Sequence, residues 1–300
     1  MKCYRTRFRA PRDGIWSDAM HTTWRRDGVL VLEGFATERQ CGELRRRMAQ
    51  LVEGFDPVQQ PLSVFTTRDD AHADRDALFL ASGEEVAFFF EEDALDVQGR
   101  LRWPKEEALN KVGHALHEYD PVFERFSRRA DLARLAHEAG VRRPKLVQSM
   151  YIFKHPRRGS EVRWHQDGAF LRTTPLSVVG FWLALDDATL DNGCLQALPG
   201  MHREPLRTRF VRRGWRADLD VLDPRPWPEA QAVALDVPRG TLVMLHGALP
   251  HASGHNHSDQ PRAAYALHVV DGTARYAADN WLQRTRRPFR GFQPTSDVAW

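Results

Sequence analysis

Two side chains that could bind a metal ion lie one residue apart in the run VRWHQDGAFL, residues 162–171. They are His165 and Asp167, and the rest of the run has the composition of a half-buried strand. Residues i and i+2 of a strand share a face, so this pair could supply two ligands to one metal. It could also be an ordinary hydrogen-bonded pair at a sheet edge. Gln166 is then expected to face away, and Gly168 to leave room beside the metal.

A third ligand is required, because a non-heme Fe(II) site takes two histidines and one carboxylate and leaves the other positions open. The segment LHGALPHASGHNHSDQPRAAYALH contains five candidates: His246, His251, His255, His257 and His268. The long interval between Asp167 and His251 suits a return from one strand to another across a β sandwich. His251 is favoured over the others because of an arginine that follows it.

That arginine is Arg262, which follows His251 across the turn-rich segment GHNHSDQP. A planar guanidinium forms bidentate pairs with carboxylates, so it could anchor the far carboxylate of an oxo-acid cosubstrate. Ala264 and Ala266 share its strand face and are small, which leaves space inside a barrel. Ser253 shares a face with His251 and could donate its hydroxyl to the same ligand.

The remaining histidines have simpler interpretations. His246 fits a core position, and His255 and His257 fit a solvated turn, although the histidine cluster could also form an adventitious surface metal site. His114 and His117 lie three residues apart in a predicted helix, where they could bind a metal or simply face solvent.

Helical patterns dominate the first half of the chain. Helices are expected over residues 17–27, 37–55, 104–120 and 120–140, the last with a break near Arg129. Ser17 suits an N-cap, Thr37 and Gln40 have the spacing of a capping box, and Pro104 suits a first helical position. VLVLEGF and VAFFFEE are expected to be short strands.

Short β-rich runs follow from Pro144 onward, separated by turns such as DNG and PRG. Many short strands at this spacing predict a double-sheet barrel or jelly roll. We therefore expect one α+β domain over residues 1–300, with a helical part at about 15–140 and a jelly-roll core at about 144–282.

Composition excludes several classes of protein. The chain has 42% hydrophobic and 28% charged residues and a net charge of +3, an ordinary globular profile. Arginine and acidic residues are interspersed, so no nucleic-acid partner is expected. No apolar run is long enough for a membrane span. Cys3, Cys41 and Cys194 form no disulfide framework, which favours the reducing cytoplasm. The basic run NWLQRTRRPFRGF is expected to be a solvated tail.

Several blocks of sequence point to one family: NKVGHALHEYDPVF, QSMYIFKHP, WHQDGAFL, GFWLALDDATLDNGCLQALPGMH, LHGALPHASGHNHSDQPRAAYALH and DNWL. Through them the chain, from about Leu109 to Leu282, resembles the phytanoyl-CoA dioxygenase (PhyH) family of Fe(II)- and 2-oxoglutarate-dependent oxygenases. The resemblance implies the following roles: iron ligands and catalytic residues His165, Asp167 and His251, a 2-oxoglutarate anchor at Arg262 with Ser253 beside it, and a cosubstrate pocket lined by Lys111, Met150 and Trp182. Lys111 also fits a helix surface, and Trp182 a strand core.

The resemblance further implies that O2 and 2-oxoglutarate are consumed, a small organic substrate is hydroxylated, and succinate and CO2 are released. Two other classes stay open. One is a cupin-like metalloenzyme that works without 2-oxoglutarate, against which the position of Arg262 argues. The other is a non-catalytic metal- or ligand-binding protein. The sequence does not name the primary substrate, the regiochemistry or the oligomeric state. FEEDALDVQGRLRWP and the arginine-rich loop 203–228 are expected to border the site, and the loop favours an anionic substrate.

Overall fold

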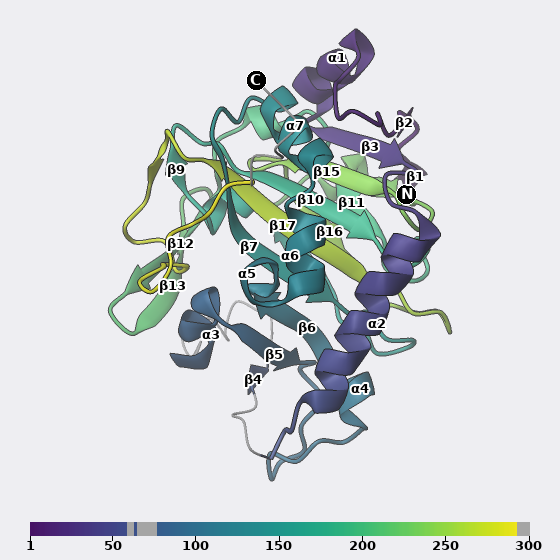
Figure 1. Cartoon of the computed structure of the whole chain (residues 1–300), viewed down its shortest axis with the longest axis vertical. Coiled ribbons are helices and arrows are strands. Elements are labelled where there is room, and N and C mark those ends of the chain that lie inside the picture. Colours follow the sequence, from purple (N-terminus) through teal and green to yellow (C-terminus); the bar gives the residue numbers. More distant parts are fainter. Residues whose placement is uncertain (59–62, 65–76, 293–300) are drawn as a thin grey trace.

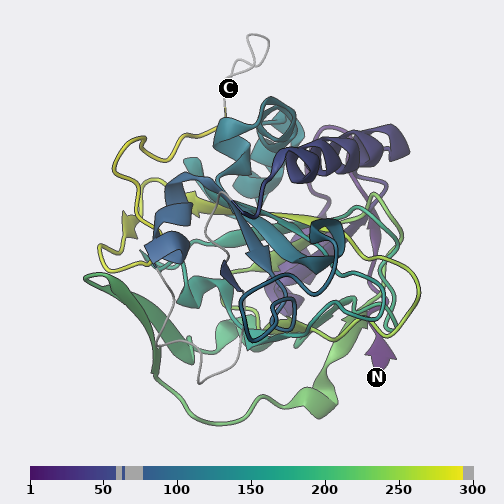
Figure 2. The same cartoon turned by 90° about the horizontal axis from the view of Figure 1, so that it is seen from below.

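The computed structural model describes residues 1–58, 63–64 and 77–292 of the chain. The α-helices of the described part are α1 (Asp18–Asp27), α2 (Glu38–Gly54), α3 (Ala77–Ala81), α4 (Lys105–Ala108), α5 (Leu116–Tyr119), α6 (Pro121–Ser127) and α7 (Ala130–Glu138). Two β-sheets form the centre of the molecule, and the helices α2, α6 and α7 lie together on one side of them (Figures 1 and 2).

The larger sheet has the spatial order β2 (Phe8–Arg9), β3 (Val29–Glu33), β15 (Leu242–His246), β10 (Val179–Ala184), β17 (Ala264–Asp271), β7 (Pro144–Ile152), β6 (Leu109–His114), β5 (Val86–Phe90) and β4 (Ser63–Val64). The smaller sheet has the order β1 (Lys2–Cys3), β14 (Val233–Leu235), β11 (Leu195–Ala197), β16 (His251–Ser253) and β8 (Val162–His165). Two further pairs are β12 (Thr208–Arg213) with β13 (Arg216–Val221), and β9 (Thr173–Thr174) with β18 (Arg275–Tyr276). This arrangement is the α+β jelly roll that the sequence predicts.

Strand β10 shows how the alternation of side chains builds two cores. Phe181 and Leu183 pack toward the helices, in a cluster that includes Leu44 of α2. Trp182 and its neighbours on the other face pack in a second cluster, which includes Leu195 of the smaller sheet. Because neighbouring side chains of a strand point to opposite faces, one strand joins the helical layer to the interior of the jelly roll.

The helix ends predicted from the sequence are confirmed in most places. Ser17 caps α1 through a hydrogen bond from the Met20 backbone N–H. Thr37 and Gln40 form both bonds of the capping box at the start of α2. The break near Arg129 separates α6 from α7. VLVLEGF and VAFFFEE contain β3 and β5, as predicted.

The helix predicted over residues 104–120 is wrong. Pro104 is an N-cap, α4 ends at Ala108, and residues 109–114 form β6 between β5 and β7. All six residues of β6 are buried, so pairing and burial on both sides outweigh the local helical pattern. His114 and His117 are consequently fully buried rather than on a helix surface, and they contact the hydroxyl groups of Ser82 and Ser149.

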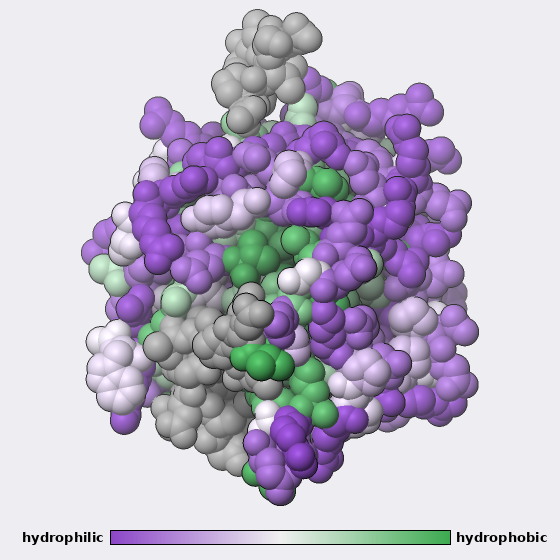
Figure 3. All heavy atoms as spheres, turned by 60° about the horizontal axis from the view of Figure 1, so that its bottom comes forward, coloured by the Kyte–Doolittle hydropathy of each residue, from purple (hydrophilic) through white to green (hydrophobic). Residues whose placement is uncertain are grey.

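The face shown in Figure 3 is mainly hydrophilic, but it has a hollow in which hydrophobic side chains gather. Within the described residues, no helix combines the length and the apolar composition that a membrane crossing requires.

Candidate active site

A cavity of about 760 Å³ opens between the two sheets. All eight residues that the sequence analysis assigns to the site line it: His165, Asp167, His251, Ser253, Arg262, Lys111, Met150 and Trp182. They come from both sheets and from the turns that follow β8 and precede β17. Residues distant in the sequence are therefore brought to one space.

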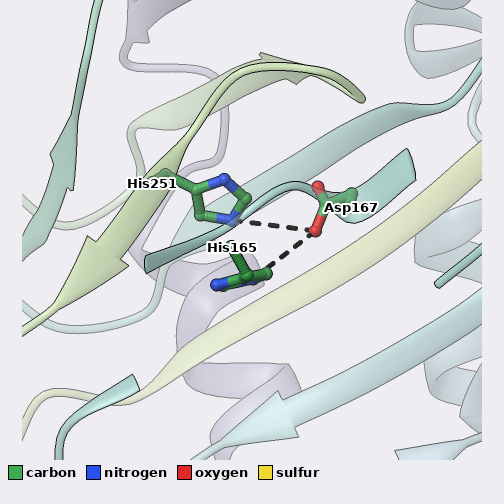
Figure 4. Close-up of side chains that lie close together, drawn as sticks. All are labelled: His165, Asp167 and His251. Carbon is green, nitrogen blue, oxygen red and sulfur yellow. Dashed lines mark ion pairs between the residues drawn. The ribbon is translucent and has the colours of Figure 1, made fainter. Parts of the chain in front are cut away.

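The three proposed metal ligands face one another (Figure 4). His165 ends β8 and lies directly opposite His251, the first residue of the neighbouring strand β16. The Asp167 Oδ1 atom is 3.7 Å from the Nε2 atom of each histidine, and the two imidazole centroids are 4.2 Å apart. One ligand atom from each residue lies within 4.8 Å of the others. Two nitrogens and one carboxylate oxygen are the donor set of a non-heme Fe(II) site.

Backbone carbonyls orient both imidazoles. His165 Nδ1 lies 2.8 Å from the Arg163 carbonyl oxygen, and His251 Nδ1 lies 3.1 Å from that of Leu249. We assign the Nδ1 protons to these bonds, which leaves each Nε2 lone pair directed at the centre, as metal-binding histidines require. Burial, together with His251, lowers the pKa of His165 to about 4. His165 is therefore neutral near pH 7 and able to bind a metal.

Asp167 is ionised in spite of its burial. Burial alone raises the pKa of the Asp167 carboxyl, but the imidazoles of His268, His251 and His165 outweigh it and hold the pKa well below its usual range. Asp167 lies just beyond the strand, as the first residue of a 3-10 turn, Asp167–Ala169. The backbone of Gln166 is still extended (φ −121°, ψ 126°), so the alternation of extended residues directs the Asp167 carboxylate to the side of His165.

The residues beside the pair show one confirmation and one error. Gln166 faces away from the metal ligands, since its side-chain amide donates to the Ala248 carbonyl at 2.8 Å. Gly168 was expected to leave room for the metal, but a Cβ there would lie 2.9 Å from the Gly247 carbonyl oxygen. The absence of a side chain at Gly168 makes room for a backbone segment instead.

Two residues around Asp167 were missed by the sequence analysis as supports of the metal site. His268 of β17, considered only as a ligand, has its Nε2 atom 3.2 Å from the second carboxylate oxygen, Oδ2. Gly180 of β10 leaves room for that oxygen, because a Cβ there would lie 2.8 Å from Asp167 Oδ2. A lone glycine inside a strand pattern indicates such a close approach, so Gly180 could have been found from the sequence.

Gly180→Ala is expected to weaken metal binding roughly 10- to 100-fold, the range typical for groups that orient a metal ligand. The added methyl group would displace the Asp167 carboxylate. Co(II) titration followed by visible absorption measures the affinity. Gly42→Ala in α2 is the matched control, because a Cβ there meets open space. Equal Co(II) affinities of the wild type and Gly180→Ala would contradict this role for Gly180.

Arg262 is the most unusual charge in the cavity. Its side chain is 1% exposed, and within the described residues its Nε and Nη1 atoms have no hydrogen-bond partner. Burial lowers the pKa of the guanidinium to about 10. Its centre lies 5.4 Å from the Trp182 ring. A buried cation without a partner is costly, so this environment suits an anionic group supplied by a ligand.

The other predicted cosubstrate residues lie on adjoining strands. Trp182 of β10, Ala266 of β17 and Met150 of β7 are direct neighbours across the larger sheet. Lys111 of β6 is buried, with its ammonium 5.3 Å from the Phe89 ring, so it is not on a helix surface. Ala266 lines the cavity as expected, whereas Ala264 packs in the core between the sheets.

The remaining histidine candidates lie outside the ligand set. His246 packs against Trp24 and His202, and burial lowers its pKa to about 4. The rings of His255 and His257 lie 5.9 Å apart. Within the described residues, the His165 set is the one group of three or more metal-binding side chains with this proximity.

The far wall of the cavity is largely apolar. The arginine-rich loop forms the β12–β13 hairpin and the segment after it, and these contribute Leu219, Val221 and Trp227 to the wall. Two of its arginines, Arg209 and Arg213, pair with Asp220, which weakens the argument for an anionic substrate. FEEDALDVQGRLRWP contributes no lining residue.

The prediction that NWLQRTRRPFRGF, residues 280–292, is a solvated tail is wrong for its first residues. Trp281 is 1% exposed, stacks on Phe79 with ring centroids 4.5 Å apart, and lines the cavity. Hydrophobic burial therefore holds the start of this basic run against the fold, although its arginines gave the run a polar pattern.

Comparison with known proteins gives a consistent result. A family model described as Phytanoyl-CoA dioxygenase (PhyH) matches residues 24–264. "Phytanoyl-CoA dioxygenase" of Arabidopsis thaliana is 43% identical over 262 residues, covering 87% of this chain and 91% of the relative. "Phytanoyl-CoA dioxygenase domain-containing protein 1" of Mus musculus is 40% identical over 269 residues, covering 86% and 92%.

The solved structure of EctD from S. alaskensis in its apo form superposes with a TM-score of 0.63 at 19% identity, covering 97% of this chain and 89% of that one. EctD has also been solved with bound Fe, and with 2-oxoglutarate and 5-hydroxyectoine. The likeness shows a shared double-stranded β-helix fold.

Proposed function

Because this chain belongs to the phytanoyl-CoA dioxygenase family and is a non-heme iron, 2-oxoglutarate-dependent dioxygenase, we propose that it hydroxylates a small organic substrate and releases succinate and CO2. One observation carries the proposal. The His165, Asp167 and His251 ligand atoms face a common point in a cavity that also contains the Arg262 guanidinium, whose Nε and Nη1 atoms have no hydrogen-bond partner among the described residues.

The side chains fit both groups that the reaction requires. His165, Asp167 and His251 would hold Fe(II), and Arg262 would pair with the far carboxylate of 2-oxoglutarate, with Ser253 beside it. When bound, iron and 2-oxoglutarate together supply the oxidation by O2.

Contacts within the protein hold the metal ligands in place and cover the Arg262 guanidinium. Backbone carbonyls fix the two imidazoles, His268 and Gly180 fix the carboxylate, and Trp182 covers the guanidinium.

The cavity also indicates how a substrate would be held. Phe79, Phe170 and Trp281 line it, and Phe170 lies with its ring centroid 6.0 Å from that of His165. An apolar part of the substrate would pack on these rings, which places an adjacent C–H bond near the metal ligands. Such packing excludes water and orients the substrate.

A succinate-release screen tests the function. The protein is supplied with Fe(II), ascorbate, 2-oxoglutarate and candidate organic acids, CoA thioesters or amino acids. The reaction is run under 18O2, and the masses of the products are measured by mass spectrometry. The expected result is Fe(II)-dependent succinate, stimulated by one substrate that gains one 18O atom. Conversion of a substrate without 2-oxoglutarate would instead indicate a cupin-like metalloenzyme, and ligand binding with no succinate would indicate a non-catalytic binder.

A further inference from the structure

Lys154 is a buried lysine behind the cavity wall, two residues beyond the end of β7. It is 2% exposed, and it is not among the lining residues. Its ammonium donates to the backbone carbonyls of Ser160 and Gly254, each at 2.5 Å. Its own carbonyl accepts from the Arg262 backbone N–H at 3.0 Å and from the Asn256 side chain at 3.0 Å.

These contacts join the segments that carry the proposed site. Ser160 lies just before β8, which ends at His165. Gly254 directly follows β16, which contains His251 and Ser253. One residue therefore sets the separation of the two strands that carry histidine ligands, and it also holds the backbone of the guanidinium anchor. Small displacements of groups that position a ligand have large effects on binding and rate.

A second buried group, the Glu91 carboxylate, holds the same segment around Ser160. The Glu91 carboxylate accepts from the Ser160 hydroxyl at 2.5 Å and from the Asn110 amide at 2.9 Å, and burial raises its pKa. Burial and the neighbouring Arg262 cation hold the pKa of Lys154 well below its ordinary range. A dianion bound at Arg262 would favour the charged form of Lys154, because opposite charges attract strongly where water is excluded.

We propose that Lys154 is a positioning residue for 2-oxoglutarate, which ties Ser160 and Gly254 together and holds Arg262 at the cosubstrate end of the cavity. The inference rests on the proposed function. The 2-oxoglutarate end should depend on the Lys154 side chain more than the metal end, because its ammonium holds Gly254, the neighbour of Ser253, whereas His165 and His251 lie further along their strands. The Arg262 N–H bonds the backbone carbonyl of Lys154, and a substitution keeps that contact.

Lys154→Met tests the proposal, since methionine has a similar length and no donor. Binding of 2-oxoglutarate is measured without O2 through the charge-transfer absorption of the Fe(II)–2-oxoglutarate complex. The dissociation constant for 2-oxoglutarate is expected to rise about tenfold or more, because the substitution removes both hydrogen bonds that the Lys154 ammonium donates to Ser160 and Gly254. The Co(II) affinity without 2-oxoglutarate should change less than about twofold. Lys145→Met, on strand β7, which ends two residues before Lys154, is the matched control.

Unchanged 2-oxoglutarate binding in folded Lys154→Met would overturn the proposal. Equal losses of 2-oxoglutarate and Co(II) affinity would do the same, since they would mean that Lys154 only maintains the fold. If Lys154→Met does not fold, the titration is made on Lys154→Gln, which keeps an amide donor, and a selective loss of 2-oxoglutarate affinity is again required. A wild-type protein that gives no charge-transfer band counts against the proposed function itself.

Discussion

Asp167→Ala is expected to lower 2-oxoglutarate turnover at least ~100-fold at saturating Fe(II), because even groups that only orient a metal ligand contribute about 10- to 100-fold. Asp167 supplies the carboxylate of the site, and it lies 3.7 Å from both imidazole Nε2 atoms. His251→Ala should have an effect of the same size. Succinate formation without added substrate measures the turnover.

Two controls separate loss of the metal from a general loss of structure. Asp259→Ala removes an exposed carboxylate that pairs with Arg157, and His257→Ala removes a histidine from the same histidine-rich segment as His251. Both should keep wild-type turnover. Full succinate production by Asp167→Ala, or its loss in His257→Ala, would contradict the assignment of His165, Asp167 and His251 as the metal ligands.

Arg262→Met is expected to raise the KM for 2-oxoglutarate at least ~30-fold, because loss of one partner of a buried charge pair costs roughly 2–5 kcal/mol. The same substitution should not destabilise the fold of the protein without 2-oxoglutarate. Removal of a buried, unpaired cation should leave the free energy of unfolding unchanged or raise it by about 1 kcal/mol or more. KM measurements and thermal unfolding without and with 2-oxoglutarate test the two statements together.

This combination of weaker 2-oxoglutarate binding and an undiminished free energy of unfolding makes the prediction specific. If Arg262 only maintained the fold, its replacement would lower both the stability and the 2-oxoglutarate affinity. Arg262→Lys should recover only part of the affinity, because an ammonium cannot form the bidentate pair of a guanidinium. Arg157→Met, which removes an exposed ion pair, is the control and should leave the KM unchanged. An unchanged KM in Arg262→Met would reject the anchoring role.

The parts of the fold that depend on local rules could be predicted from the sequence. The caps at Ser17 and Thr37 are local hydrogen-bond patterns, and the structure contains both. The alternating strands after Pro144 form the jelly roll, because each must bury one face. The spacing of His251 and Arg262 also indicated that both belong to one site, because a short strand and a turn bring both side chains into one cavity.

What could not be predicted depends on tertiary contacts. Residues 109–114 have a helical pattern but form an interior strand, because they pair with β5 and β7 along both edges and all six are buried. The 3-10 turn that begins at Asp167 ends the strand pattern there, because the Gly168 backbone packs against the Gly247 carbonyl of a distant segment. The contact of His268 with Asp167 arises from β17, a strand distant in the sequence. Trp281 is buried because Phe79, also distant, provides a partner.

An anaerobic titration of the wild type with Fe(II) and then 2-oxoglutarate tests the central claim most directly. His165, Asp167 and His251 would hold the iron, and Arg262 would bind the far carboxylate of 2-oxoglutarate in the same cavity. The predicted result is a charge-transfer band that saturates at one 2-oxoglutarate per iron in the wild type and is absent in His251→Ala. No band in the wild type, or an undiminished band in His251→Ala, would contradict the account.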